Sequence, residues 1–175
     1  MTVDVASLTL PRRLNDKLKE KAANIGVLPE ELGVEFLLKG LNEELDPEEL
    51  VEHYQLLSEK YLTEARELLK EEDLVQAQPF KKALTENASL KFWGATALAV
   101  KRVAAIRGLK LDKHGSLWDF VSKISRESGD EDFIRLFFTA NALHRNVYEG
   151  QMNKEALEIA NRDIEKLIDK LRRIS

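Results

Sequence analysis

The chain has 175 residues, of which 43% are apolar, enough for one ordinary domain or two small ones with a packed core. The formal net charge of −4 singles out no class of partner, and the lack of cysteine excludes disulfides and cysteine-ligated zinc. No apolar run approaches the roughly 18 residues of a membrane span and no secretory pattern opens the chain, so we expect a cytoplasmic protein without membrane contact.

The first expected element is a short strand over residues 3–10, where apolar residues alternate with small or polar ones. This alternation gives one face with Leu8 and Leu10 and an opposite face with Val5, Ser7 and Thr9. A single strand leaves its backbone groups unpaired. We therefore expect a homodimer in which the N-terminal strands of two copies pair.

Two helices are expected after Pro11. The first runs from about Arg12 to Asn24 and stops before Gly26, and the second runs from Pro29 to about Leu45. This order of strand, helix and helix resembles the ribbon-helix-helix fold. We expect a dimerisation domain over residues 1–46.

The resemblance to the ribbon-helix-helix fold also implies candidate DNA contacts. They are the outward strand residues and the two cations beside them, namely Val5, Ser7, Thr9, Arg12 and Arg13. The strand offers none of the Arg, Lys, Asn or Gln side chains that read bases best, and Glu30 and Glu31 place negative charge at the start of the second helix. Dimerisation without DNA and weak DNA binding therefore both stay open.

A boundary is expected in "NEELDPEELVEHY". Asp46 can cap a helix, Pro47 suits the first helical position, and Glu48 and Glu49 favour its positive end. A second domain is expected over residues 47–175. Its apolar residues recur at helical spacing in five stretches, which predict helices near 47–72, 79–107, 115–125, 130–150 and 154–174. We expect a mainly α protein, an antiparallel helical bundle preceded by the strand-helix-helix unit.

Four short stretches of the second half, in this order, resemble the archaeal PaREP family, first branch, whose members are similar to HEPN helical bundles. The stretches are "DLVQA" (73–77), "LKFWGATALAVK" (90–101), "KHGSLWDFV" (113–121) and "ALHRNVYEG" (142–150). The resemblance spans about 50–175 and implies a HEPN-like bundle. Residues 78–88 depart from the pattern as an apparent insertion.

Active HEPN proteins cut RNA without a metal, with an Arg followed after four to six residues by a His. The resemblance places that Arg at Arg145, with Asn146 beside it, but positions 150–152 are Gly, Gln and Met. Without an imidazole there, no side chain near Arg145 has an ordinary pKa suited to proton transfer at neutral pH. We expect no catalysis, and keep a metal-independent ribonuclease or nucleotide-handling enzyme with an altered site as the alternative.

The stretch "ALHRNVYEG" is the strongest candidate site, with His144, Arg145, Asn146, Tyr148 and Glu149. His144 and Tyr148 share one helix face, Arg145 and Glu149 can pair, and Asn146 lies about 200° round from His144. One interpretation is structural, with both rings buried in the bundle. The other is a ligand pocket at a bundle or dimer seam for a nucleotide or RNA.

No pattern in the sequence indicates a cofactor or a metal site. Two classes of function follow from these observations. The first is a non-catalytic dimeric interaction or nucleic-acid-associated protein, of the toxin–antitoxin or defence type that the two resemblances suggest, with a cognate toxin or antitoxin as a partner. The second is the altered ribonuclease.

Overall fold

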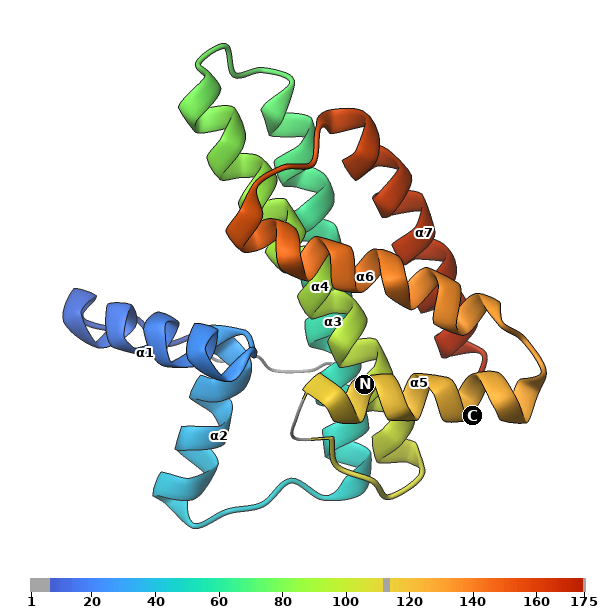
Figure 1. Ribbon diagram of the computed structural model, residues 1–175. Coiled ribbons are helices and arrows are strands. Elements are labelled where there is room, and N and C mark those ends of the chain that lie inside the picture. Colours follow the sequence, from blue (N-terminus) through green and yellow to red (C-terminus); the bar gives the residue numbers. More distant parts are fainter. Residues whose placement is uncertain (1–6, 112–113, 175) are drawn as a thin grey trace. The chain divides into compact units, whose positions relative to one another are not determined.

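A computed structural model describes residues 7–111 and 114–174. Within them the chain forms seven helices and no strand, which confirms a mainly α protein (Figure 1). The helices are α1 (Arg12–Ile25), α2 (Pro29–Leu41), α3 (Pro47–Glu72), α4 (Gln78–Ile106), α5 (His114–Ser128), α6 (Asp132–Glu149) and α7 (Lys154–Arg172). The chain divides into two compact units, Met1–Glu44 and Leu45–Ser175.

The predicted N-terminal strand is wrong. Residues 7–11 form no secondary structure, and Val5 and the other residues before Ser7 lie outside the described part. The physical reason is that backbone N–H and C=O groups of a strand need a partner strand, and alternation alone supplies none. Among the described residues of this unit the first element is therefore the helix that starts at Arg12, and no strand precedes it there to complete a strand-helix-helix arrangement.

The two N-terminal helices end in left-handed residues that stop helix propagation. After α1, Gly26 has φ 81°, a value that glycine adopts without steric cost. After α2, Asn42 has φ 54°, and its N–H donates to the carbonyl of Lys39 at 3.2 Å. Asparagine tolerates this conformation better than most residues. The second helix is thus shorter than the prediction, which extended it to Leu45.

The first helix of the larger unit begins as the sequence predicts. Asp46 Oδ1 accepts from the backbone N–H of Glu49 at 2.9 Å, and Glu49 Oε2 accepts from the N–H of Asp46 at 3.0 Å. This reciprocal capping box satisfies two backbone donors that have no partner within the helix. Pro47 occupies the first turn, where its missing N–H costs nothing.

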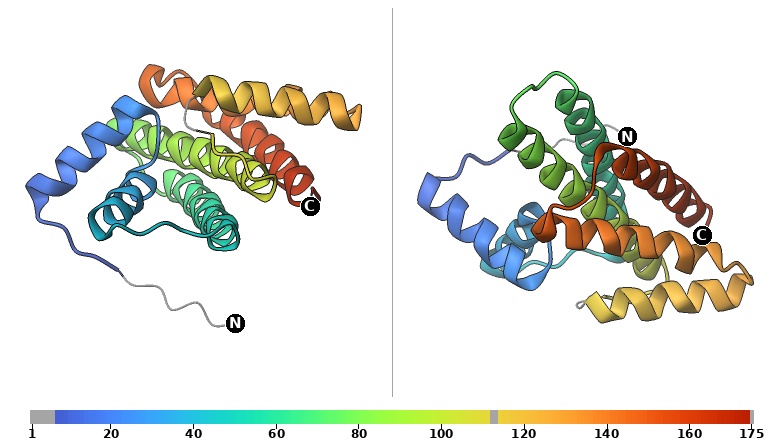
Figure 2. Two further views of the ribbon diagram at one scale, coloured as in Figure 1. Left: turned by 90° about the horizontal axis from the view of Figure 1, so that it is seen from below. Right: turned by 45° about the horizontal axis from the view of Figure 1, so that its top comes forward.

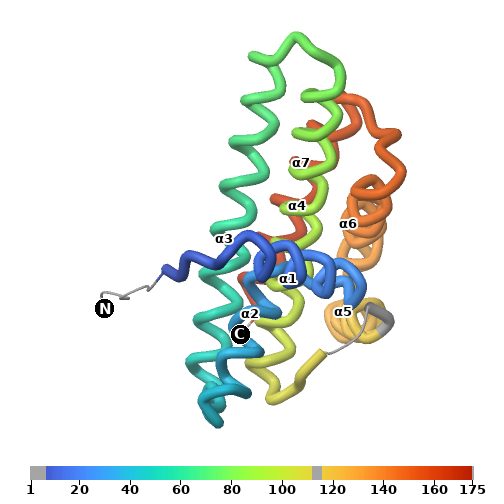
Figure 3. Tube along the Cα trace, turned by 90° about the vertical axis from the view of Figure 1, so that its left-hand side faces the viewer, coloured from blue at the N-terminus to red at the C-terminus, as the bar shows by residue number. Residues whose placement is uncertain are grey.

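Helix α4 is the centre of the larger unit. It packs against α3, α5, α6 and α7, and Figure 2 shows α3 on one side of it and α5 and α6 on the other. Every residue from Phe92 to Val100 is buried, as expected for a helix that neighbours surround. Four of those residues are Gly or Ala, which let adjacent helices approach closely. Helices α3 and α4 run antiparallel (Figure 3).

The last three helices cover the other side of α4. Helix α5 packs against α4 and α6, and α7 packs against α4 and α6. Helix α7 buries one apolar face, with Leu157, Ile164, Ile168 and Leu171 at most 1% exposed, whereas Ile159 is 53% exposed. The helix predicted near 154–174 from the spacing of apolar residues is therefore confirmed.

Candidate functional site

The stretch "ALHRNVYEG" forms the C-terminal half of α6. The helix ends where the sequence predicts, because Gly150 adopts φ 57° and its N–H donates to the carbonyl of Asn146 at 2.9 Å. Gly150 also lies against α4, since a Cβ at this position would come within 2.8 Å of the Glu86 carboxylate and 2.9 Å of Lys82 Cε. The site thus sits where the end of α6 meets the first turns of α4.

Asn146 is a buried structural residue, with 3% of its surface exposed. Its Nδ2 donates to Ser89 Oγ on α4 at 2.8 Å, and its Oδ1 accepts from the N–H of Met152 at 2.9 Å. Ser89 Oγ in turn donates to the carbonyl of Thr85 at 2.9 Å. The Asn146 amide therefore joins α4, α6 and the turn into α7.

His144 stacks on the indole of Trp93 from α4. The two ring centroids lie 4.5 Å apart with an interplanar angle of 14°, an offset-stacking distance for aromatic rings. Tyr148 meets His144 edge-on at 6.0 Å. His144 is half-buried and Tyr148 is 64% exposed. The structural interpretation therefore holds in part for His144 and is wrong for Tyr148, which lies at the surface.

Arg145 and Glu149 form the ion pair that the sequence predicts. Arg145 Nη2 lies 3.0 Å from Glu149 Oε1, and the two side chains are 67% and 43% exposed. Because water strongly screens the charges of an ion pair this exposed, the pair contributes little to the free energy of unfolding.

The five candidate residues thus divide into three groups. Asn146 points into the bundle, His144 and Tyr148 follow one edge of α6, and Arg145 and Glu149 face solvent. This division agrees with the predicted angle between His144 and Asn146 on a regular helix. It provides a polar surface on which Arg145, among the described residues, pairs with the exposed Glu149 carboxylate.

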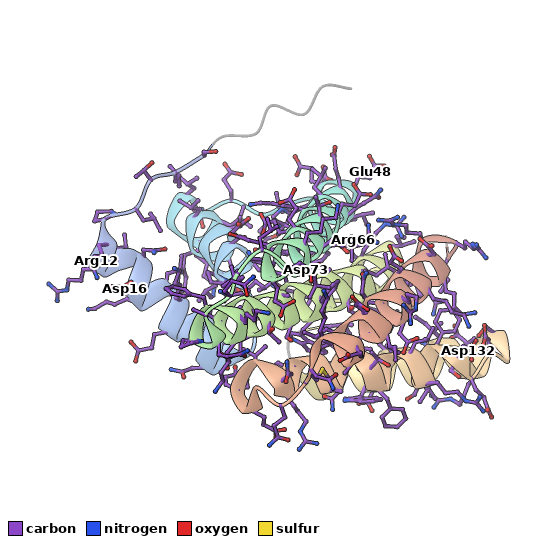
Figure 4. All side chains as sticks on the ribbon, turned by 90° about the horizontal axis from the view of Figure 1, so that it is seen from above. Arg12, Asp16, Glu48, Arg66, Asp73 and Asp132 are labelled. Atoms are coloured by element: carbon purple, nitrogen blue, oxygen red, sulfur yellow. The ribbon has the colours of Figure 1, made fainter. Side chains whose placement is uncertain are left out.

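The N-terminal candidates lie on exposed parts of the smaller unit. Ser7 and Thr9 are exposed and belong to no strand, and Val5 lies outside the described residues. Arg12 and Arg13 are exposed in the first turn of α1, and Figure 4 labels Arg12 there. Because residues 7–11 form no strand, the described part of the chain does not present Ser7 and Thr9 on a strand face.

A polar cavity between α3 and α7 was missed from the sequence. It has a volume of about 400 Å³ and is lined by Arg66, Arg172 and three carboxylates, those of Glu59, Glu165 and Asp169. Arg66 donates to Glu165 across the cavity, and Arg172 Nη2 lies 3.6 Å from Glu59. The partners are about a hundred residues apart in the chain, so no local pattern indicated that they meet.

Other kinds of site find no support in the part of the chain that the structure describes. It contains no group of three or more His, Asp or Glu side chains that could hold a metal ion. None of its helices is both long and apolar enough to cross a membrane.

A family model described as the archaeal PaREP1/PaREP8 family matches residues 78–168, just over half of the 175-residue chain. The match begins at residue 78 and includes residues 78–88, and it covers α4, α5, α6 and most of α7. No curated protein and no solved structure matches the chain significantly.

Proposed function

The chain belongs to the archaeal PaREP1/PaREP8 family, and from this premise we propose that it is a non-catalytic, dimeric interaction protein. The observation that carries the proposal is the surface of the smaller unit. Six of its large apolar side chains are between 40% and 70% exposed: Leu8, Leu14, Ile25, Phe36, Leu37 and Leu41.

A two-helix unit of this size cannot shield so much apolar surface by itself. Each exposed leucine or phenylalanine that becomes buried contributes about 1.5–3 kcal/mol, so association with a second copy is favoured. At 44 residues, the unit is only slightly longer than the roughly 40 residues below which a fold usually needs help from oligomerisation, a metal or disulfides. We therefore propose that the helices of the smaller unit form the homodimer contact.

The candidate site supports the absence of catalysis. Asn146 uses its amide to join α4 to α6, and His144 stacks on Trp93. Both side chains thus make contacts to α4, and these contacts favour a structural role for them. In the HEPN-like bundle that we propose for the larger unit, the surface of α6 would serve recognition, in a toxin–antitoxin or defence setting with a cognate toxin or antitoxin as partner.

The dimer is tested by light scattering at micromolar concentration. The wild-type chain should have the mass of two copies, and the double variant Leu14→Glu with Leu37→Glu should have the mass of one. Leu74→Glu is the matched control, because Leu74 is 82% exposed on the larger unit. A monomeric wild-type chain, or a control that dissociates equally, would overturn the proposal.

The second candidate function is association with RNA or a nucleotide. It is favoured by the exposed pair of Tyr148 and Arg145 on α6, because bases stack on aromatic rings and phosphates bind guanidinium groups. Purified protein should then bind single-stranded RNA without cutting it. RNA decay that Arg145→Ala abolishes would instead support the altered ribonuclease.

A further inference from the structure

We propose that an apolar groove between the start of α3 and the end of α4 is the docking site for a basic amphipathic helix of a partner protein. The groove has a volume of about 580 Å³. Its apolar lining comes from Val51, Leu56, Ala105 and Ile106, and its charged lining from Glu48 and Glu52. None of these residues belongs to the candidate site on α6.

Two of the four apolar side chains that line the groove are exposed to water. Leu56 is 42% exposed and Ile106 is 37% exposed, although both belong to helices whose other faces form the core. Single exposed apolar residues are ordinary, but here two helices expose them side by side along one groove. The groove thus offers two exposed apolar side chains, one from each helix, to an incoming apolar side chain.

The charge on the groove points to a cationic occupant. Glu48 and Glu52 stand four residues apart on α3, where like charges face each other and repel. Neither has an ion-pair partner among the described residues, whereas other pairs at this spacing, such as Lys60 with Glu64, join opposite charges. Figure 4 labels Glu48 at this end of α3. Lys or Arg side chains from a partner would relieve the repulsion.

The shape of the groove favours a helix over a small molecule or a nucleic acid. A drug-sized ligand needs most of its surface enclosed, but this groove is open along one side. From Glu48 to Leu56 the groove follows α3 for about 12 Å, which matches two turns of an incoming helix with anchors at i, i+4 and i+7. The two carboxylates repel nucleic-acid phosphates and anionic lipid head groups.

The test is the binding of a fluorescently labelled peptide made of leucine and lysine in amphipathic helical order, measured by anisotropy at physiological ionic strength. The wild-type chain should bind it saturably. Glu48→Lys with Glu52→Lys should weaken binding by at least about tenfold. Glu67→Lys with Glu71→Lys is the matched control, because both residues are exposed on the same helix, outside the groove, and change the net charge equally. The control should bind as the wild type does.

A second pair of variants tests the apolar part of the groove. Leu56→Ser should weaken binding, and Leu74→Ser, outside the groove, should not. Circular dichroism should show the same helix content for all variants. Absence of saturable binding by the wild type, or equal weakening by both charge-reversed pairs, would overturn the proposal.

The mass of each variant in light scattering distinguishes the proposed helix-binding groove from the proposed homodimer contact. If the groove accepted a second copy instead, the groove variants would lose dimer mass in light scattering, and the proposal would fall. We expect the groove variants to stay dimeric, and the Leu14→Glu and Leu37→Glu variant to bind the peptide as a monomer.

Discussion

Successive side chains on a helix point about 100° apart, so adjacent residues of one stretch have unlike surroundings. In α6 this rotation places Asn146 inside the bundle and Arg145 in solvent. The five candidate side chains of this stretch therefore make three kinds of contact. Asn146 hydrogen-bonds inside the bundle, His144 stacks on an aromatic ring, and Arg145 pairs with Glu149 at the surface. The residues have different effects on stability as a result.

Asn146→Ala should lower the free energy of unfolding by about 2 kcal/mol. The substitution leaves the Met152 N–H without its acceptor inside the bundle and removes the donor to Ser89 Oγ. Arg145→Ala, one position away, should cost less than about 0.5 kcal/mol, because it removes an exposed pair. Urea titration measures both values, and equal costs would contradict the structural role of Asn146.

Asp130 should make stability depend on pH in the acid range. A hydrogen bond from Lys170 lowers the pKa of Asp130 below its ordinary value of 3.8, assisted by the N–H of Asp132 and the nearby charges of Lys170 and Lys166. A carboxyl group whose pKa is lower in the folded state stabilises that state when it is ionised. This contribution is present above the ordinary pKa and is lost as the pH falls through the lowered one.

The variant Asp130→Asn isolates this contribution of Asp130. The difference in unfolding free energy between wild type and variant should be largest near neutral pH. It should shrink as the pH falls to 3.8 and below. Other carboxyl groups titrate equally in both proteins and cancel in the difference. A difference that does not change with pH would refute the assignment.

At the scale of elements, the ends of helices follow local chemistry and their packing follows side-chain size. Helix α3 begins at a capping box, α6 ends at a left-handed glycine, and α7 begins where Asn153 Oδ1 accepts from the N–H of Ala156 at 2.9 Å. Helix α4 lies at the centre of the unit because its buried stretch contains small residues on every side, and these let neighbouring helices pack against it.

Asp46→Ala should lower the free energy of unfolding of the larger unit by about 1 kcal/mol, because the N–H of Glu49 loses its acceptor. Asp46→Asn is the control, since the amide oxygen can still accept this hydrogen bond. It should retain most of the stability. Thermal unfolding followed by circular dichroism compares the two, and equal losses would show that the cap is not the cause.

At the scale of the whole molecule, the chain consists of two units that differ in how many apolar side chains they bury. The larger has an extensive core of aromatic and aliphatic side chains, and the smaller buries few apolar side chains and leaves many exposed. The exposed apolar surface of the smaller unit is the basis for the proposed dimer. The same unit carries Arg12 and Arg13, the cations considered for DNA.

Binding to duplex DNA, if measured, should be weak and should fall steeply with salt. Arg12 and Arg13 can neutralise few phosphates even when a dimer doubles them, and residues 7–111 and 114–174 contain no strand that could read bases. Fluorescence anisotropy with a random duplex at two salt concentrations measures this. Sequence-specific binding in the nanomolar range at physiological salt would contradict the prediction.

Much of the fold could be predicted because its signals are local. Pro47, Gly26 and Gly150 mark helix ends through their own backbone preferences, and the spacing of apolar residues marks the buried face of α7. The strand at residues 3–10 was predicted wrongly because alternation describes a face and does not provide a partner. The exposure of Tyr148 was missed because helical periodicity does not tell how far a neighbouring helix reaches.

The sequence by itself determined the mainly helical class, the family, most helix ends and the pairing of Arg145 with Glu149, since each depends on residues close together in the chain. Only the tertiary structure decided that Asn146 donates a hydrogen bond to Ser89, that His144 stacks on Trp93, and that α3 and α4 leave a groove lined by apolar residues and by two glutamates of α3. These contacts join residues about 50 positions apart. Their geometry depends on how helices pack, which side-chain volumes across the whole core determine together.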